Sequence, residues 1–324
     1  MKKISALLML ICAALLLCAC TGEKPAAEEA APIVIGFSQL GSESSWRIGN
    51  TKDMTEAAER AGITMMLKDG RQKQENQIAA IREFIAHRVD VIVFSPIVED
   101  GWDNVLREAK QAGIPVLLID RIIQTTDDSL YAGCIGADFY LEGRNAGEYL
   151  LKKADAMGAK ELHVVEITGT EDSTPMRQRM KGFHSVVDGD SRIVTLESVN
   201  GDFLRSRGRE CMEYLLKKYD GEIDVVYSHN DSMTLGAIEA LEAAGVKPGQ
   251  DVIIITVDGE QAAIDLLKEG KINCVVECTP MLGDEVMRLC TKLAGGEKIV
   301  KLTHPVEQVF TDFDDLTQIG PRGY

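Results

Sequence analysis

Ile114-Pro-Val-Leu-Leu-Ile-Asp-Arg121 is the stretch of this sequence that decides the fold. Five of its first six residues are apolar, and the run stops at the charged pair Asp120-Arg121. A short, continuous apolar run that ends this abruptly predicts a strand buried on both faces of a parallel sheet. The charged pair then lies at the carboxyl end of the strand, where open α/β sheets bind their ligands.

Asp120 and Arg121 have the chemistry to hold a polyhydroxylated ligand. A carboxylate accepts hydrogen bonds from neighbouring hydroxyl groups, and a guanidinium donates to ring and hydroxyl oxygens in a fixed fork. The alternative is that Asp120 caps a helix and Arg121 is its solvated partner. The rest of the chain favours the binding site.

Outward from this stretch, strands and helices alternate. Strands are predicted at residues 33–39, 63–67, 89–96, 114–121, 161–167, 193–199, 223–228, 252–257 and 272–278. Helices are predicted at residues 44–61, 74–87, 102–112, 139–153, 175–187, 204–219, 233–244 and 281–294. Alternation with helices of this length indicates βαβ units and a parallel sheet.

The two halves of the chain resemble each other. VDVIVFSP (89–96) matches IDVVYSHN (223–230), and IPVLLIDR (114–121) matches VIIITVDG (252–259). In both halves the later strand ends on an aspartate, Asp120 or Asp258. We therefore expect an α/β protein with two similar Rossmann-like domains, and a ligand between them would meet strand ends from both sheets.

Composition and charge exclude several classes of protein. The chain has 324 residues, of which 45% are hydrophobic and 27% charged, which is enough for two domains with cores. The net charge of -16 and pI near 4.8 argue against nucleic-acid binding, which needs a basic face. Anionic membrane surfaces would not attract such a chain either.

The N-terminus predicts export. A basic Met1-Lys-Lys is followed by an apolar stretch, residues 4–17, too short to span a bilayer comfortably. Leu17-Cys18-Ala19-Cys20 resembles a bacterial lipobox, which implies a signal peptide at 1–19 and lipidation of Cys20; a plain signal peptide cut nearby is the alternative. Residues 20–32 are small, polar and charged, and indicate a flexible tether.

Five of the eight cysteines lie beyond the signal, at positions 134, 211, 274, 278 and 290. Cys274 and Cys278 have no histidine near them in sequence, so we expect no zinc site. Buried free thiols are favoured, and one disulfide remains the alternative.

Polar and aromatic residues recur where the strands end, at Gln39, Glu43, Trp46, Arg47, Asp69, Asp120, Arg121, Arg177, Arg179, Asp202, Phe203, Asn230 and Asp258. Trp46 could cover the C–H face of a sugar ring or belong to the core, and the same choice holds for Phe203. Arg177 and Arg179 open a helix, where the macrodipole does not favour cations. Capping explains Asp231 better than Asn230. No G-x-S-x-G, H-E-x-x-H, P-loop or dinucleotide motif is present, so we expect no enzyme and no cofactor or metal.

These motifs together resemble a known family. GFSQLGSESSWR (36–47), KDGRQKQENQI (68–78), LIDR (118–121), NGDFLRSRG (200–208), HND (229–231) and VDG (257–259) are similar to the type I sugar-binding proteins of bacterial ABC importers. Within the ribose- and galactose-binding group, the first two motifs resemble the galactofuranose-binding branch. The shorter motifs mark the superfamily, which also includes the effector domains of lac-repressor-type regulators.

The resemblance implies the type I periplasmic-binding-protein fold with a three-segment hinge near residues 137, 278 and 305. The lobes would be 33–137 plus 279–305 and 138–278 plus 306–324. The ligand-binding residues would be Glu43, Ser44, Ser45, Trp46, Arg47, Asp120, Arg121, Arg177, Arg179, Phe203, Asn230, Asp258 and Cys278. Either Arg177 or Arg179 would reach the sugar. Cys278, or Glu277 if the alignment slips, stands where ribose binders carry a glutamine, a departure that leaves the identity of the sugar open.

The function expected from this resemblance is capture of a galactofuranose-, galactose- or ribose-like monosaccharide and its delivery to an ABC permease. The protein would be a monomer, lipid-anchored outside the cell membrane or in the periplasm. A sugar-sensing receptor for a membrane kinase or chemoreceptor is the alternative. A transcription regulator would need an N-terminal helix-turn-helix, but a signal peptide is predicted at that position, so we set this function aside. A secreted enzyme would be favoured only if the protein turned over a glycoside.

Overall fold

The computed structural model describes residues 32–324. The predicted signal peptide, Cys20 and all of the tether except Pro32 lie outside this part of the chain. Within it, no helix is both long and apolar enough to cross a bilayer.

The first sheet is six-stranded and parallel, in the order β2-β1-β3-β4-β5-β11. Its strands are β1 (Val34–Gln39), β2 (Thr64–Asp69), β3 (Val91–Phe94), β4 (Val116–Ile119), β5 (Gly133–Ile135) and β11 (Leu302–Thr303). β3 has the sequence VIVF and β4 the sequence VLLI, and every residue of both strands is buried. The strand predicted from the opening stretch is therefore β4, near the middle of the sheet, and the prediction of its burial is confirmed.

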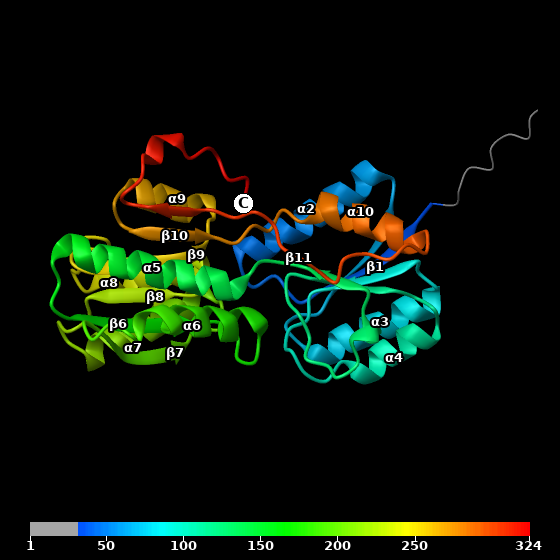
Figure 1. Cartoon of the computed structure of the whole chain (residues 1–324), viewed down its shortest axis with the longest axis horizontal. Coiled ribbons are helices and arrows are strands. Elements are labelled where there is room, and N and C mark those ends of the chain that lie inside the picture. The colour runs from blue at the N-terminus through cyan, green and yellow to red at the C-terminus, as the bar shows by residue number, and fades with distance from the viewer. Residues whose placement is uncertain (1–31) are drawn as a thin grey trace, which may run out of the picture. The chain divides into compact units, whose positions relative to one another are not determined.

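Helices cover both faces of this sheet (Figure 1). They are α2 (Ser45–Ala61), α3 (Gln74–His87), α4 (Asp103–Gln111) and α10 (Gly283–Ala294). α2 and α10 share one hydrophobic core beneath the sheet, and α3 and α4 share the other, around Phe84 and Trp102. α2 ends at Gly62, whose φ of 66° is the left-handed conformation that closes a helix and that glycine adopts without strain.

The second sheet repeats the first, in the order β7-β6-β8-β9-β10-β12. Its strands are β6 (Leu162–Thr168), β7 (Ile193–Asn200), β8 (Val225–Ser228), β9 (Ile253–Asp258), β10 (Cys274–Glu277) and β12 (Val309–Thr311), of which β12 alone is antiparallel. Its helices are α5 (Phe139–Met157), α6 (Thr174–Val187), α7 (Arg205–Lys218), α8 (Asp231–Ala243) and α9 (Gln261–Lys268). The matching strand order confirms the internal similarity read from the sequence.

The structure differs from the predicted elements in a few places. α5 continues to Met157, because the glycine that ends it is Gly158. The eight-residue helix α9, the short strands β5, β11 and β12, and the 3-10 helices Asp128–Leu130 and Leu316–Gln318 were not predicted. All five cysteines of the described chain are buried and free, so the alternative of a disulfide is wrong.

The chain passes between the two sheets three times: after β5, after β10, and between β11 and β12. The two lobes also touch away from these crossings. The Trp46 backbone N–H donates to Glu260 Oε1 at 3.0 Å, and the hydroxyl of Thr174 donates to the carbonyl of Ile122 at 3.1 Å. The lobes are therefore in contact along both edges of the space between the strand ends.

Candidate functional site

A cavity lies between the carboxyl ends of the two sets of strands. It contains about 310 Å³ of space not filled by protein atoms, part of which is open to solvent. Thirteen residues line it: Glu43, Ser44, Trp46, Arg47, Asp120, Arg121, Phe139, Pro175, Arg179, Phe203, Asn230, Asp258 and Cys278. Both lobes contribute to this lining.

Eleven of the residues proposed from sequence are among these thirteen. Ser45 is not: it is exposed at the start of α2. Arg177 is not either, because its half-exposed side chain pairs with Asp172 at 2.5 Å and lies 3.7 Å from Glu99. Of the two candidate arginines, the structure therefore places Arg179 at the cavity. Glu277 is not in the lining; it pairs with Arg322.

In the first lobe, one arginine joins two carboxylates. Arg47 Nε is 3.1 Å from Glu43 Oε1, and Arg47 Nη2 is 2.7 Å from Asp120 Oδ2. All three side chains are at least 95% buried. Although burial acts against the charged form, the two carboxylates raise the pKa of Arg47. The guanidinium therefore stays charged and fixes both acids at the cavity wall.

The second lobe repeats this arrangement. Arg179 Nε is 2.7 Å from Glu142 Oε2, and Arg179 Nη2 is 3.6 Å from Asp258 Oδ1. Arg179 Nη1 also donates to the carbonyl of His229 at 2.5 Å. Burial raises the pKa of Asp258 well above its usual value, with Arg179 opposing that rise. Each lobe thus presents a Glu–Arg–Asp set, with the Asp at the end of the corresponding strand.

Both aspartates adopt unusual backbone conformations. Asp120 has φ 62° and Asp258 has φ 125°, where residues other than glycine are uncommon. Strain of this kind persists only where the surroundings hold it, and it concentrates at functional sites. Asp120 caps no helix, so the capping alternative for this residue is wrong; its backbone N–H instead donates to Ile135 at 2.7 Å.

Two buried polar atoms of the wall have no hydrogen-bond partner within residues 32–324. They are Glu43 Oε2 and Arg121 Nε, the latter 3.8 Å from Asp120 Oδ2. Asp120 Oδ2 accepts from Ser95 Oγ at 3.0 Å and pairs with Arg47, while no described side chain donates to Asp120 Oδ1. Burial first, and then Arg47, lower the pKa of Arg121 to about 10. Unpaired buried polar groups are costly, and a ligand with hydroxyl groups would satisfy them.

Aromatic rings complete the wall. Trp46 is 5% exposed, and its indole N–H donates to the Cys278 carbonyl at 2.6 Å, so it bridges the lobes as well as lining the cavity. Phe203 has φ 59°, and its ring lies 5.4 Å from the Arg121 guanidinium carbon. A side chain at position 169 would overlap this ring, with its Cβ 1.8 Å from the ring, which explains Gly169.

Two expectations about capping are corrected here. Asn230, not Asp231, is the N-cap of α8, and its Oδ1 accepts from the Met233 N–H at 2.9 Å. Asp231 is buried and accepts from the backbone N–H groups of Gly259 and Glu260 at 2.8 and 2.7 Å. Asp231 thus holds the loop after β9 in which Asp258 lies. Burial raises its pKa to about 8, with Glu260 adding to the rise.

Sequence reasoning missed Phe139 and Pro175 in the lining. Both lie in the first turn of a helix, Phe139 directly after the first crossing and Pro175 at the start of α6. Pro175 could have been found from the sequence, because it follows the end of a predicted strand. Phe139 could not have been found in this way, because its helix follows a crossing between the sheets.

Comparisons with known proteins agree with this geometry. Residues 35–298 match the model of the periplasmic binding protein domain. The galactofuranose-binding protein YtfQ of Escherichia coli (strain K12) is 44% identical over 253 residues, which cover 78% of this chain and 79% of that protein.

Two solved structures are also similar. A Mycobacterium smegmatis protein in complex with β-D-fucofuranose has a TM-score of 0.84 and 43% identity, covering 87% of this chain and 92% of that one. The binding protein of the arabinose ABC transporter of Shewanella sp. ANA-3, bound to α- and β-L-arabinofuranose, has a TM-score of 0.83 and 40% identity, covering 86% and 91%. The chain belongs to the periplasmic binding protein family.

Proposed function

We propose that this protein is an extracytoplasmic receptor, lipid-anchored through Cys20, that captures a monosaccharide in its furanose form and delivers it to an ABC importer. The observation that carries the proposal is the inter-lobe cavity, where each lobe presents an arginine paired with an aspartate, Arg47 with Asp120 and Arg179 with Asp258. Carboxylates and guanidinium groups in fixed pairs are suited to bind the hydroxyl groups of a sugar. Membership of the periplasmic binding protein family supports the transport role.

The furanose form is favoured by the relatives. The three relatives described above are named for, or bound to, galactofuranose, fucofuranose and arabinofuranose. The cavity lies between the two lobes and is lined by carboxylates, guanidinium groups and aromatic rings, which suits a small polyhydroxylated ligand.

Seven wall residues have a direct role in this proposal. Asp120 and Asp258 accept hydroxyl hydrogen bonds from the two sides, and Arg121 and Arg179 donate to sugar oxygens. Trp46 and Phe203 cover apolar C–H faces of the ring. Asn230 Oδ1 accepts from the first turn of α8, and one side-chain N–H donates to the Phe203 carbonyl at 3.4 Å, so the second side-chain N–H is the donor left for the sugar.

Closure of the two lobes would trap the sugar. The lobes are 33–137 plus 279–305 and 138–278 plus 306–324, and the three crossings between them are short enough to act as a hinge. A ligand that contacts both lobes favours the closed arrangement by its additional contacts there.

A thermal-shift screen of the domain 33–324 tests this function. A ligand that binds the native state alone raises the melting temperature by mass action. L-Arabinose, D-fucose and D-galactose, which reach the furanose form in water, should raise it. Their methyl pyranosides, locked in the six-membered ring, serve as matched controls and should not. A shift with the locked pyranosides would refute the furanose preference, and no shift with any sugar would refute the proposed function.

A further inference from the structure

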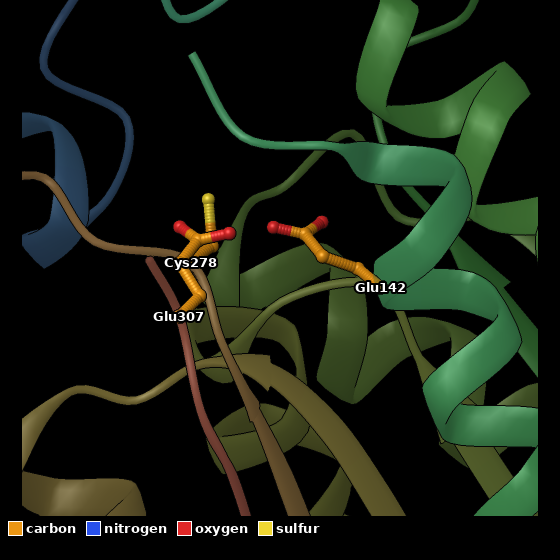
Figure 2. Close-up of side chains that lie close together, drawn as sticks. All are labelled: Glu142, Cys278 and Glu307. Atoms are coloured by element: carbon orange, nitrogen blue, oxygen red, sulfur yellow. The ribbon is translucent and has the colours of Figure 1, made fainter. Parts of the chain in front are cut away.

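Three side chains meet where the crossings converge, and only one of them, Cys278, also lines the sugar cavity. Glu142 lies in the first turns of α5, Cys278 directly follows β10, and Glu307 precedes β12 (Figure 2). Their carboxyl oxygens and thiol lie within 4.8 Å of one another. Glu142 is far from the other two residues in sequence, so only the fold brings the three together.

Carboxyl groups at this cluster outnumber the cations that face it. Arg179 pairs with Glu142 Oε2 at 2.7 Å, but the same guanidinium also faces Asp258. The neighbouring Glu277 is already paired with Arg322. Within residues 32–324 no cation pairs with Glu307, whose Oε1 accepts from the Thr279 N–H at 2.7 Å. The cluster therefore has room for a cation of its own.

One oxygen of this cluster is unsatisfied. Glu142 is 2% exposed, and its Oε1 has no hydrogen-bond partner in the described chain. The Cys278 thiol is near enough to influence the pKa of Glu142 without making a well-formed hydrogen bond to it. Glu142 is not in the lining of the sugar cavity, so a sugar there would leave this oxygen unpaired. Figure 2 shows its carboxyl group reaching toward Cys278 and Glu307.

We propose that Glu142, Cys278 and Glu307 form a binding site for a divalent transition-metal ion of the zinc type. Around tetrahedral zinc, bond lengths of about 2.0–2.3 Å place ligand atoms about 3.3–3.8 Å apart. The separations here, up to 4.8 Å, reach that geometry with small side-chain movements. A thiolate with two carboxylates favours Zn²⁺ or Cd²⁺ over Mg²⁺ and Ca²⁺, which prefer oxygen alone.

The ion would join the second and third crossings to the start of α5. It would place a cation at the cluster without displacing Arg179 from the sugar cavity. Proton release is a necessary part of this binding, because a thiol binds zinc only after it has given up its proton. Zinc affinity should therefore increase with pH.

Calorimetric titration of the untagged domain 33–324 with ZnCl₂, in a phosphine reductant, tests the site. We expect one ion per chain, with proton release seen as a dependence of the heat on the buffer. Cd²⁺ should produce the ultraviolet charge-transfer band of a cadmium–thiolate bond. Cys278→Ala should abolish that band, and Glu307→Gln should weaken Zn²⁺ binding at least tenfold. Matched controls are Cys290→Ala, a buried cysteine of α10, and Glu285→Gln, a carboxylate on the surface of α10.

Glu307→Gln can keep the Thr279 hydrogen bond through its amide oxygen, so it tests the site even if Cys278→Ala does not fold. The proposal is wrong if the wild-type domain does not bind Zn²⁺ at millimolar concentration. It is equally wrong if Zn²⁺ binds as tightly to Glu307→Gln as to the wild type, because the ion would then occupy surface carboxylates. Sugar binding is tested separately, by the thermal-shift screen without added metal.

Discussion

Asp120→Asn separates the binding role of this residue from its structural role. Asparagine is among the residues that tolerate the left-handed conformation, so the φ of 62° at position 120 should be retained. The amide oxygen can take the place of Oδ2, which accepts from Ser95 Oγ at 3.0 Å and pairs with Arg47 at 2.7 Å. The amide N–H₂ then replaces the free oxygen Oδ1. The substitution thus keeps the shape of the site and reverses one hydrogen-bonding role.

Two free-energy changes should follow. Loss of charge assistance in the bond from Arg47 should lower the free energy of unfolding by about 1–2 kcal/mol, because bonds to charged groups contribute about 1.5–3 kcal/mol and neutral ones about 0.5–1.5. In the complex, a donor now faces a sugar hydroxyl that donated to Oδ1, and the charge assistance is gone there too. We expect a loss of about 2–4 kcal/mol of binding, roughly thirty- to a thousand-fold in affinity.

Calorimetric titration with the best sugar of the thermal-shift screen measures the second change, and urea unfolding of the same variant measures the first. Asp69→Asn is the matched control, since Asp69 ends β2 in the same sheet but does not line the cavity. Its affinity should equal that of the wild type. Sugar binding by Asp120→Asn within a few-fold of the wild type would refute the hydrogen-bonding role, whatever the stability result.

Three further predictions concern the anchor, the hinge and a buried network. Cys20→Ala should leave the protein unlabelled by a radioactive fatty acid and shed into the medium, whereas equal membrane retention would argue against the lipobox. Small-angle scattering should show a smaller radius of gyration at saturating sugar than without it, and an unchanged profile would rule out closure about the hinge. His184, 3.4 Å from buried Glu166, has a pKa raised to about 9 by this carboxylate, so its contribution to stability is present below pH 6.5 and is lost as pH rises toward 9. Urea titration should therefore show that the wild type is more stable than His184→Gln at low pH and that this difference decreases as pH rises toward 9. A difference that does not change with pH would exclude a contribution from protonated His184.

Much of the fold could be predicted because the strands are short and fully buried. Runs such as VIVF in β3 and VLLI in β4 have no polar side to face water, so a parallel sheet between helices was the consistent solution. The helix α9 was missed because it has only eight residues. It also follows directly after Asp258-Gly259, which was interpreted as part of the binding site. β11 and β12 have two and three residues, too few to show a period.

The candidate site was predictable where strand ends marked it, and less so elsewhere. Arg179 could have been chosen over Arg177 from helical spacing, because Phe183 and Val187 follow it at intervals of four and are buried on the same face of α6. Glu142 and Glu307 could not have been found in this way. Each owes its place to the crossings between the lobes, and contacts across such connections leave no local pattern in the sequence.

A crystal structure of the domain with bound sugar tests the central claim most directly. We predict electron density for a five-membered sugar ring in the inter-lobe cavity, with hydroxyl groups within hydrogen-bond distance of both Asp120 and Asp258. Density for a six-membered ring would contradict the furanose preference. A sugar in contact with residues of one lobe alone, or outside the cavity, would contradict capture between the lobes.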